Sequence, residues 1–201
     1  MKIIIDTEER IAQLAAQRYV QLLNAKPAAI LGYATGSTPL GLYAELIRLN
    51  QAGKFSYAQA TSFNLDEYAG LDGSHDQSYR YFMNHNLFDH VDISKDHTFV
   101  PSGLDLSEKT AAYDKAIADA GGIDLQLLGI GNNGHIGFNE PGTPFGSLTH
   151  LTELTESTRQ AKAPIMKAAL QGPVTEEVPA SVLQLHPDVE FYLDYEGASL
   201  L

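Results

Sequence analysis

The chain has 201 residues, of which 44% are hydrophobic and 19% are charged, a composition typical of a soluble globular protein. This length fits one domain with a substantial core. The absence of cysteine excludes disulfides, thiolate catalysis and cysteine-ligated zinc. The formal net charge of −12 argues against binding to nucleic acid or to an anionic membrane surface. An anionic ligand would therefore have to be held by a local device, such as a helix N-terminus or one well-placed cation.

No apolar run approaches the length that spans a bilayer, and the N-terminal stretch is too short and too soon interrupted by an acidic residue for a signal peptide. We therefore expect a cytoplasmic protein with no membrane partner.

Hydrophobic periodicity predicts alternating strands and helices along the chain. Strands are expected at Lys2–Ile5, Ala28–Tyr33, Ala60–Leu65, His97–Val100 and Ile123–Leu128. Helices are expected from a capping box at Asp6 and Glu9 to about Leu23, over Pro39–Asn50, over Ser78–Phe88, and from a second capping box at Asp105 and Glu108 to Gly121. This alternation predicts an α/β fold with a doubly wound, mostly parallel sheet and helices on both of its faces. The sequence shows no internal repeat or linker, so residues 1–201 are expected to form a single domain.

The first loop that could bind a ligand follows the second strand and opens a helix. Thr38 is expected to cap that helix, with Pro39 at its first position. Free backbone amides at this helix start, with the hydroxyls of Ser37 and Thr38, would make an anion site suited to phosphate. A well-capped helix without any ligand is an equally good interpretation of these residues taken alone.

The second loop carries two adjacent carboxylates, Asp66 and Glu67, just past the third strand. The carboxyl ends of strands in an open α/β sheet form the edge at which a general base would lie. On the residues alone, the simpler interpretation is favoured, in which one carboxylate caps the next turn or faces water.

The third loop, GIGNNGHIGFNEPG at 129–142, is the most informative stretch of the chain. His135 and Glu140 are separated by glycine and could both face one pocket, where a carboxylate would stabilise the charged imidazole and fix its tautomer. The alternative is a tight glycine turn with a surface histidine, which we consider less favoured because so many glycines are costly unless backbone must approach something. With no GxSxG motif and no metal-ligand spacing, the three loops together indicate proton transfer on a phosphorylated small molecule.

The chain resembles the glucosamine-6-phosphate deaminase family in five segments. These are ATGSTP at 34–39, FNLDEYAGL at 63–71, QSYRYFM at 77–83, LLGIGNNGHIGFNEPG at 127–142 and PASVLQLH at 179–186. The resemblance implies a Rossmann-like fold and the conversion of glucosamine 6-phosphate and water to fructose 6-phosphate and ammonia, without cofactor or metal. The place of such a reaction is the catabolism of amino sugars.

The resemblance also implies roles for particular residues. Asp66 would move a proton between C1 and C2 of the open-chain sugar. His135 would open the pyranose ring, assisted by Glu140 and Asn133. The loop Thr35-Gly36-Ser37-Thr38 would hold the 6-phosphate.

Two features of the resemblance concern regulation. Asn133 stands where some family members have Asp, and it would orient His135 without adding charge. Basic residues that bind an allosteric activator in hexameric members are lacking between residues 143 and 152. We therefore expect a monomer without allosteric activation.

The larger departure from the family follows Arg159. A few dozen residues, with a lid segment, a phosphate-contacting Arg and a further core strand, are expected between Ala161 and Lys162 but are missing. Lys162 corresponds to the family's phosphate-contacting Lys. Either the sequence joins two stretches across an omitted segment, the explanation we favour, or the deletion is real and the protein is crippled. A covalent join predicts one helix from Arg159 to Leu170, whereas a gap predicts a break at 160–162.

Two other functions are alternatives to that of a deaminase. A sugar-phosphate lactonase or isomerase on the same fold is the nearest alternative, and the FNEP that follows the His135 segment argues against a lactonase. A non-catalytic sugar-phosphate sensor would need a DNA-binding segment, which the sequence does not contain, and it could have lost the catalytic groups, which are all retained.

Overall fold

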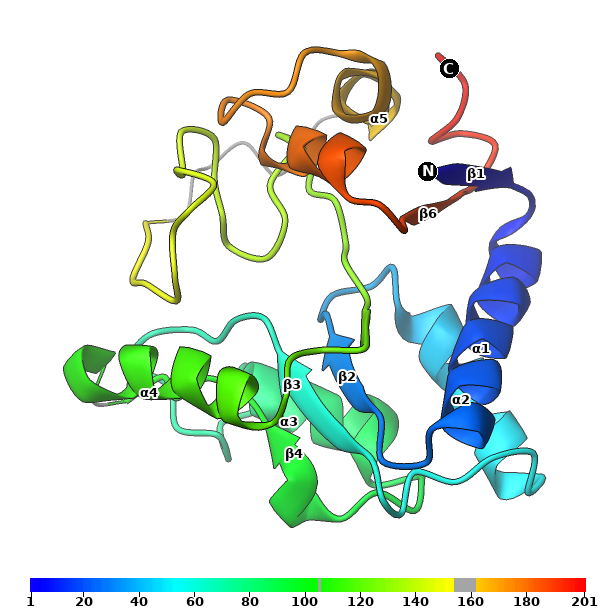
Figure 1. Cartoon of the computed structure of the whole chain (residues 1–201), viewed down its shortest axis with the longest axis vertical. Helices are drawn as coiled ribbons and strands as arrows, with labels where there is room; N and C mark the ends of the chain where they lie inside the picture. The colour runs from blue at the N-terminus through cyan, green and yellow to red at the C-terminus, as the bar shows by residue number, and fades with distance from the viewer. Residues whose placement is uncertain (105, 154–161) are drawn as a thin grey trace. The chain divides into compact units, whose positions relative to one another are not determined.

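The computed structural model describes residues 1–104, 106–153 and 162–201 (Figure 1). It comprises two compact units. The larger consists of Ala12–Leu128 and Leu148–Leu151, and the smaller of Met1–Ile11, Gly129–Ser147 and Thr152–Leu201. The expectation of a single domain stays a prediction.

The larger unit is built on a four-stranded parallel sheet with the order β4-β3-β2-β5. The strands are β2 (Ile30–Tyr33), β3 (Thr61–Asn64), β4 (Thr98–Phe99) and β5 (Leu125–Gln126). β2 and β3 are paired from Ile30 opposite Thr61 to Tyr33 opposite Asn64, so both strands end at the same level of the sheet.

One face of this sheet is covered by helices with a strongly apolar core. The helices are α1 (Glu8–Ala25), of which residues from Ala12 belong to this unit, α2 (Leu40–Gln51), and α3 (Tyr79–Met83), which continues as a π-helical turn over Asn84–Phe88. Leu31 and Tyr33, alternate residues of β2, point into this core. The Tyr33 ring stacks on that of Tyr19 and donates its hydroxyl hydrogen to Tyr57, so burial of the phenol leaves it hydrogen-bonded.

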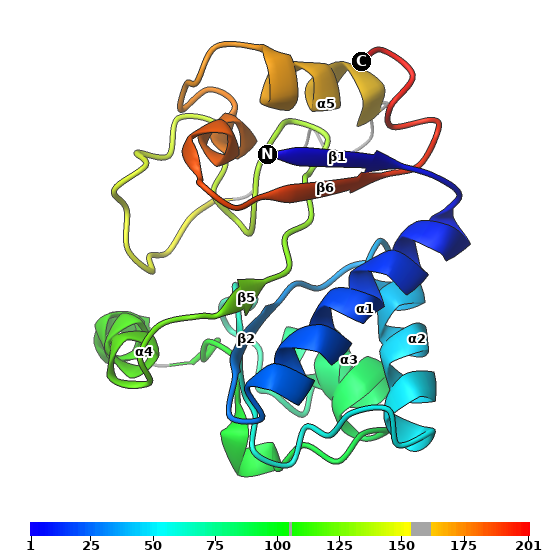
Figure 2. The same cartoon turned by 45° about the vertical axis from the view of Figure 1, so that its right-hand side comes forward.

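The opposite face is covered by α4 (Leu106–Asp119) (Figure 2). Phe63 of β3 stacks on Phe99 of β4 and meets the ring of Tyr113 edge-on. The Tyr113 hydroxyl donates to the carbonyl of Asn64 at 2.8 Å, which fastens the helix to the end of β3. Helices on both faces of a parallel sheet confirm the predicted α/β, Rossmann-like architecture.

The smaller unit contains β1 (Lys2–Ile5) and β6 (Glu190–Leu193), which form a two-stranded parallel sheet. Helix α5 (Lys162–Gln171) and a 3-10 helix over Pro179–Leu185 also belong to it. Its apolar cluster contains Met166, Leu170, Phe191 and Leu193.

Two predicted helix caps are wrong by one residue. The hydroxyl of Thr7, rather than the side chain of Asp6, accepts from the amide of Arg10 in the first turn of α1, while Asp6 accepts from the Thr7 amide. Helix α2 begins at Leu40, which puts Pro39, already in αR conformation, at the N-cap in place of Thr38.

The predicted strand Ile123–Leu128 is shorter than expected, since only Leu125 and Gln126 pair, and it is partly rather than fully buried. Among the described residues it is an edge strand, with β2 as its neighbour. Just before the paired residues, the Asp124 amide donates to the Ile30 carbonyl, but the Ile30 amide is taken by the Asp124 side chain, which also accepts from Lys26.

Three expectations lie outside the described residues: the capping box at Asp105 and Glu108, a continuous helix from Arg159 to Leu170, and a break at 160–162. In the described part of the chain, no helix combines the length and the apolar character needed to cross a membrane.

Candidate active site

The anion loop, Thr35-Gly36-Ser37-Thr38, leads from β2 into the first turn of α2. Gly36 has a φ of 101°, a left-handed backbone that glycine adopts without strain, and it turns the chain toward the helix. The amide of Leu40 donates to the carbonyl of Ser37 at 3.2 Å, which closes the turn. Gly36, Ser37 and Thr38 are exposed, as a loop that receives a phosphate from solvent should be.

Asp66 lies just beyond the end of β3, in the loop that neighbours the anion loop. Its side chain is partly buried, and burial raises the pKa of Asp66 to about 7, with the adjacent charge of Glu67 acting in the same direction. A carboxyl with this pKa is both ionised and able to carry a proton near neutrality, which is what a general base needs.

Glu67 has a different environment from its neighbour. Its carboxylate accepts hydrogen bonds from the backbone amides of Tyr79 and Arg80, at 2.8 and 3.0 Å, in the first turn of α3. The interpretation that one of the two carboxylates caps the next turn is therefore right for Glu67.

Tyr79 is a residue of this region whose role the sequence analysis did not identify. Burial raises its pKa, with contributions from a hydrogen bond with Tyr68 and from the charge of Asp66, while a hydrogen bond with Thr35 acts in the opposite direction. The Tyr79 phenol therefore interacts with Thr35 of the anion loop and is near enough to Asp66 to be affected by its charge. Its place in the QSYRYFM segment was the only signal for it.

In the smaller unit, the glycine-rich loop brings His135, Glu140 and Asn133 together. Nδ1 of His135 lies 3.8 Å from Oε1 of Glu140, whose side chain is only 9% exposed. Nδ2 of Asn133 donates to the other oxygen of Glu140, and its own Oδ1 accepts from the His135 amide at 3.2 Å. Nδ1 of His135 is buried and makes no hydrogen bond, so the ring is oriented by its surroundings and by the charge of Glu140.

Glycine at 131 is required by the His135 ring. A Cβ at Gly131 would lie 2.2 Å from both Cε1 and Nε2 of that ring. The Gly131 amide also donates to the His135 carbonyl, so the loop folds back on itself around the imidazole. Backbone at Gly131 thus lies close to the His135 ring, and the approach of a ligand to this loop stays a prediction.

The structure thus assembles two groups of predicted residues, one in each unit. Asp66 and the loop Thr35–Thr38 belong to the larger unit, whereas His135, Glu140 and Asn133 belong to the smaller. The expectation that one substrate reaches both groups stays a prediction. Lys162 is the first residue of α5, and its side chain lies outside the described part of the chain. No three carboxylate or imidazole side chains in residues 1–104, 106–153 and 162–201 gather as metal ligands would.

The fold and the loops at its strand ends define a Rossmann-like α/β protein. The chain belongs to the family of glucosamine-6-phosphate isomerases/6-phosphogluconolactonase, whose model matches residues 6–143.

Several relatives are similar along their whole length. A glucosamine-6-phosphate deaminase from Clostridium perfringens strain 13 is 44% identical, over 99% of this chain and 98% of that protein. One from Bacillus pumilus is 42% identical, over 97% of each. A solved structure of a monomeric glucosamine-6-phosphate deaminase superposes with a TM-score of 0.95 at 37% identity and covers all of both chains. The 6-phosphogluconolactonase of Trypanosoma brucei, at 19% identity and a TM-score of 0.74 over 100% and 98% of the two chains, shares the fold.

The comparison also bears on the missing segment. The alignment with the Clostridium perfringens protein spans 238 positions, whereas this chain has 201 residues, so at least 37 positions have no residue here. A few dozen residues were expected to be lacking, and the difference is of that size.

The raised pKa of Asp66 leads to a prediction about the free energy of unfolding. The folded protein holds the Asp66 proton more tightly than the unfolded chain, so ionisation costs stability as the pH rises from about 4 to 7. We expect Asp66→Asn to raise the free energy of unfolding at pH 8 by about 1–2 kcal/mol, less than the full shift implies because solvent screens the site. Denaturant unfolding should show this gain shrinking toward pH 4. The exposed Asp76→Asn in the same loop is the control, with a change below about 0.5 kcal/mol at both pH values.

The contact between Gly131 and His135 makes a second prediction. Gly131→Ala should displace the imidazole and lower the free energy of unfolding by about 1–3 kcal/mol, as overpacking does. The His135 ring resonances in the NMR spectrum should shift as well. Gly146→Ala is the matched control, because a Cβ there meets nothing within 4 Å. Unchanged ring resonances in Gly131→Ala would contradict the described packing.

Proposed function

We propose that this protein converts glucosamine 6-phosphate and water to fructose 6-phosphate and ammonia. One observation carries the proposal: the chain matches a glucosamine-6-phosphate deaminase at 44% identity over almost the whole length of both. The carboxylate of Asp66 and the His135–Glu140 pair are in addition the groups that this chemistry needs. The protein is then a hydrolase of amino-sugar catabolism.

The first step is opening of the sugar ring, which we assign to His135. The imidazole takes the proton of the anomeric hydroxyl and delivers a proton to the ring oxygen, so that the C1–O5 bond breaks and an aldehyde forms. The carboxylate of Glu140, 3.8 Å from Nδ1, stabilises the imidazolium that exists between these two proton transfers. Asn133 holds that carboxylate through its side-chain amide.

The second step is isomerisation, which we assign to Asp66. The carboxylate removes the C2 proton of the open-chain sugar, whose amino group is protonated. The electron pair forms the C1–C2 double bond, and the carbonyl oxygen takes a proton from the ammonium group, which gives a neutral enolamine. Return of the proton to C1 converts C2 to a protonated imine. Addition of water to this carbon and departure of ammonia give the ketone of fructose 6-phosphate, so one water is consumed for each ammonia released.

The phosphate is held away from the reacting carbons by the anion loop, Thr35-Gly36-Ser37-Thr38. The start of α2 presents backbone amides and a positive dipole end to the phosphate, which supplies local attraction in a protein of net charge −12. Lys162 is proposed as a second phosphate contact. The mechanism assigns no step to a metal or cofactor.

We further propose that the protein acts as a monomer in the cytoplasm. The region 143–152 contains no Lys or Arg, which argues against a basic activator site there, and a similar solved deaminase is described as monomeric. We also propose that the gene product contains a further segment between Ala161 and Lys162, in line with the 37 unmatched positions. Its intact mass should exceed that of the 201 residues.

The assignment of Asp66 is tested by ammonia release. Glucosamine 6-phosphate should yield equimolar fructose 6-phosphate and ammonia with the wild-type protein, and Asp66→Asn should lower the rate about a thousandfold because it removes the base. Affinity for the substrate, measured by calorimetry, should change less than about threefold because the shape is kept. Equal loss of affinity would remove the role from Asp66, and hydrolysis of 6-phosphogluconolactone without ammonia release would replace the proposed activity.

The assignment of His135 is tested by the form of the substrate. His135→Gln should slow ammonia release from the cyclic sugar about a hundredfold, and it should slow turnover of an open-chain analogue far less, because only the cyclic form needs ring opening. A parallel fall for both substrates would show that His135 acts in another step.

A further inference from the structure

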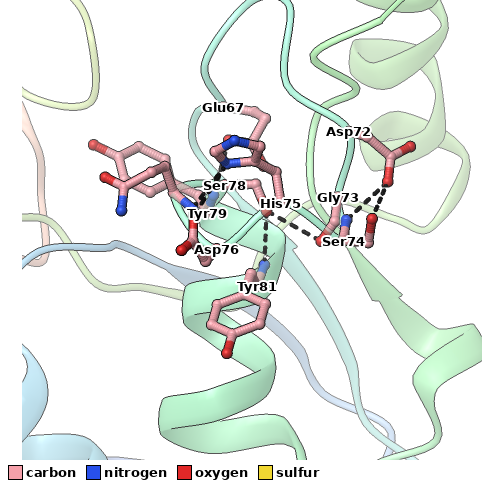
Figure 3. A network of polar contacts seen from close by, with 10 residues as sticks. Glu67, Asp72, Gly73, Ser74, His75, Asp76, Ser78, Tyr79 and Tyr81 are labelled. Atoms are coloured by element: carbon pink, nitrogen blue, oxygen red, sulfur yellow. Dashed lines mark hydrogen bonds and ion pairs between the residues drawn. The ribbon is translucent and has the colours of Figure 1, made fainter.

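The loop between Asp66 and α3 is closed by its own polar side chains (Figure 3). Asp72 accepts from the amide and the hydroxyl of Ser74 at 2.9 and 2.6 Å. The hydroxyl of Ser78 donates to the carbonyl of Gly73 at 3.1 Å and accepts from the amide of Tyr81 at 3.0 Å, which caps the start of α3. Residues 67–78 therefore form a compact loop that is held together by its own hydrogen bonds.

The closing contact of this loop is Glu67. One of its oxygens accepts from the amides of Tyr68 and Tyr79, both at 2.8 Å, and the other accepts from the amide of Arg80 at 3.0 Å. The amides of Tyr79 and Arg80 lie in the first turn of α3, where the helix has no carbonyl of its own for them. Because Glu67 follows Asp66 directly, these three hydrogen bonds also fix the backbone that carries Asp66.

Arg80 fixes the other end of this arrangement. Its guanidinium donates to the hydroxyl and to the carbonyl of Thr98, at 2.8 and 2.7 Å, so the first turn of α3 is fastened to β4. Asp66 is therefore connected through Glu67 and α3 to the sheet itself.

Within the described part of the chain, three titratable groups interact electrostatically with Asp66. Glu67 comes from its own loop, Tyr79 from α3 and Tyr113 from α4. The two phenols are neutral at physiological pH, since burial raises the pKa of each. Glu67 is therefore the charged group among the three.

We propose that Glu67 is a positioning residue for the base Asp66, and that it acts both by anchoring the Asp66 backbone to α3 and by keeping a fixed negative charge beside the Asp66 carboxylate. The inference rests on the proposed function for its kinetic test but not for its titration test. The like charge opposes ionisation of Asp66, so removing it makes Asp66 ionise at a lower pH.

The test compares Glu67→Gln with Ser78→Ala. Both remove hydrogen bonds to the first turn of α3, but only the first removes a charge. The titration of Asp66 is followed in protein labelled with ¹³C at the aspartate carboxyl carbon, with Asp66→Asn for assignment. In Glu67→Gln we expect the midpoint of Asp66 to fall by about half a unit to one unit, and the acid limb of kcat/KM for ammonia release to move down with it. In Ser78→Ala we expect a lower Tm with the midpoint unchanged.

Two outcomes would overturn the inference: an unchanged Asp66 midpoint in Glu67→Gln, or an equal fall in Ser78→Ala, which would assign the change to loosening of the loop. Should the wild-type protein release no ammonia, the proposed function fails while the titration still decides the role of Glu67.

A second variant tests the anchoring without removing the charge. Glu67→Asp keeps the charge but is one methylene too short for all three amides. We expect an Asp66 midpoint within about 0.3 units of wild type, with kcat lowered about tenfold and KM within twofold, because misplacement of a base affects the reacting geometry more than binding. An unchanged kcat would remove the anchoring role, and this variant also decides the case if Glu67→Gln does not fold.

Discussion

The pairing of β2 with β3 is the constraint on which the larger unit depends. The two strands run parallel and in register to their last residues, Tyr33 and Asn64, so the loops that follow leave the sheet side by side. Because β2 is buried on both faces, a shift of register would turn Tyr33 out of the tyrosine-rich core, which fixes the pairing. The nearness of the anion loop to Asp66 is thus a consequence of core packing, together with the hydrogen bond from the Asn64 side chain to the Tyr33 carbonyl at the strand ends.

The glycine-rich loop of the smaller unit solves a different problem. The role proposed for His135 requires one ring orientation, although its buried Nδ1 makes no hydrogen bond. The constraint comes from contact: the absence of a side chain at Gly131 leaves the space that the ring fills, and the carboxylate of Glu140, which accepts from Asn133, lies 3.8 Å from Nδ1. An unpaired buried nitrogen is costly, and such costs are typical of sites retained for chemistry.

The sequence predicted the parallel α/β fold and nearly every element of the larger unit, because strand and helix periods differ strongly and the helices alternate regularly with the strands. It predicted the ends of elements less well. Asp6 and Thr7 are both good caps, so residue type alone does not distinguish them, and in the structure Thr7 accepts from the first turn. The apolar run around β5 has the pattern of a full strand, but the Ile30 amide is taken by the Asp124 side chain rather than by a backbone carbonyl, and only Leu125 and Gln126 pair with β2.

The adjacent carboxylates show why site residues are harder to predict than folds. Asp66 and Glu67 are adjacent in the chain and chemically alike. Glu67 nevertheless accepts hydrogen bonds from three backbone amides, whereas Asp66 is desolvated beside a like charge. Amide donors stabilise the ionised form of a carboxyl group, whereas burial near a negative charge destabilises that form. The two side chains are therefore suited to different roles. That separation depends on where α3 begins, twelve residues further on, and no local pattern around residue 66 contains this information. The capping interpretation and the general-base interpretation, which compete when the sequence is considered alone, are therefore compatible, because capping describes Glu67 and the general base is proposed for Asp66.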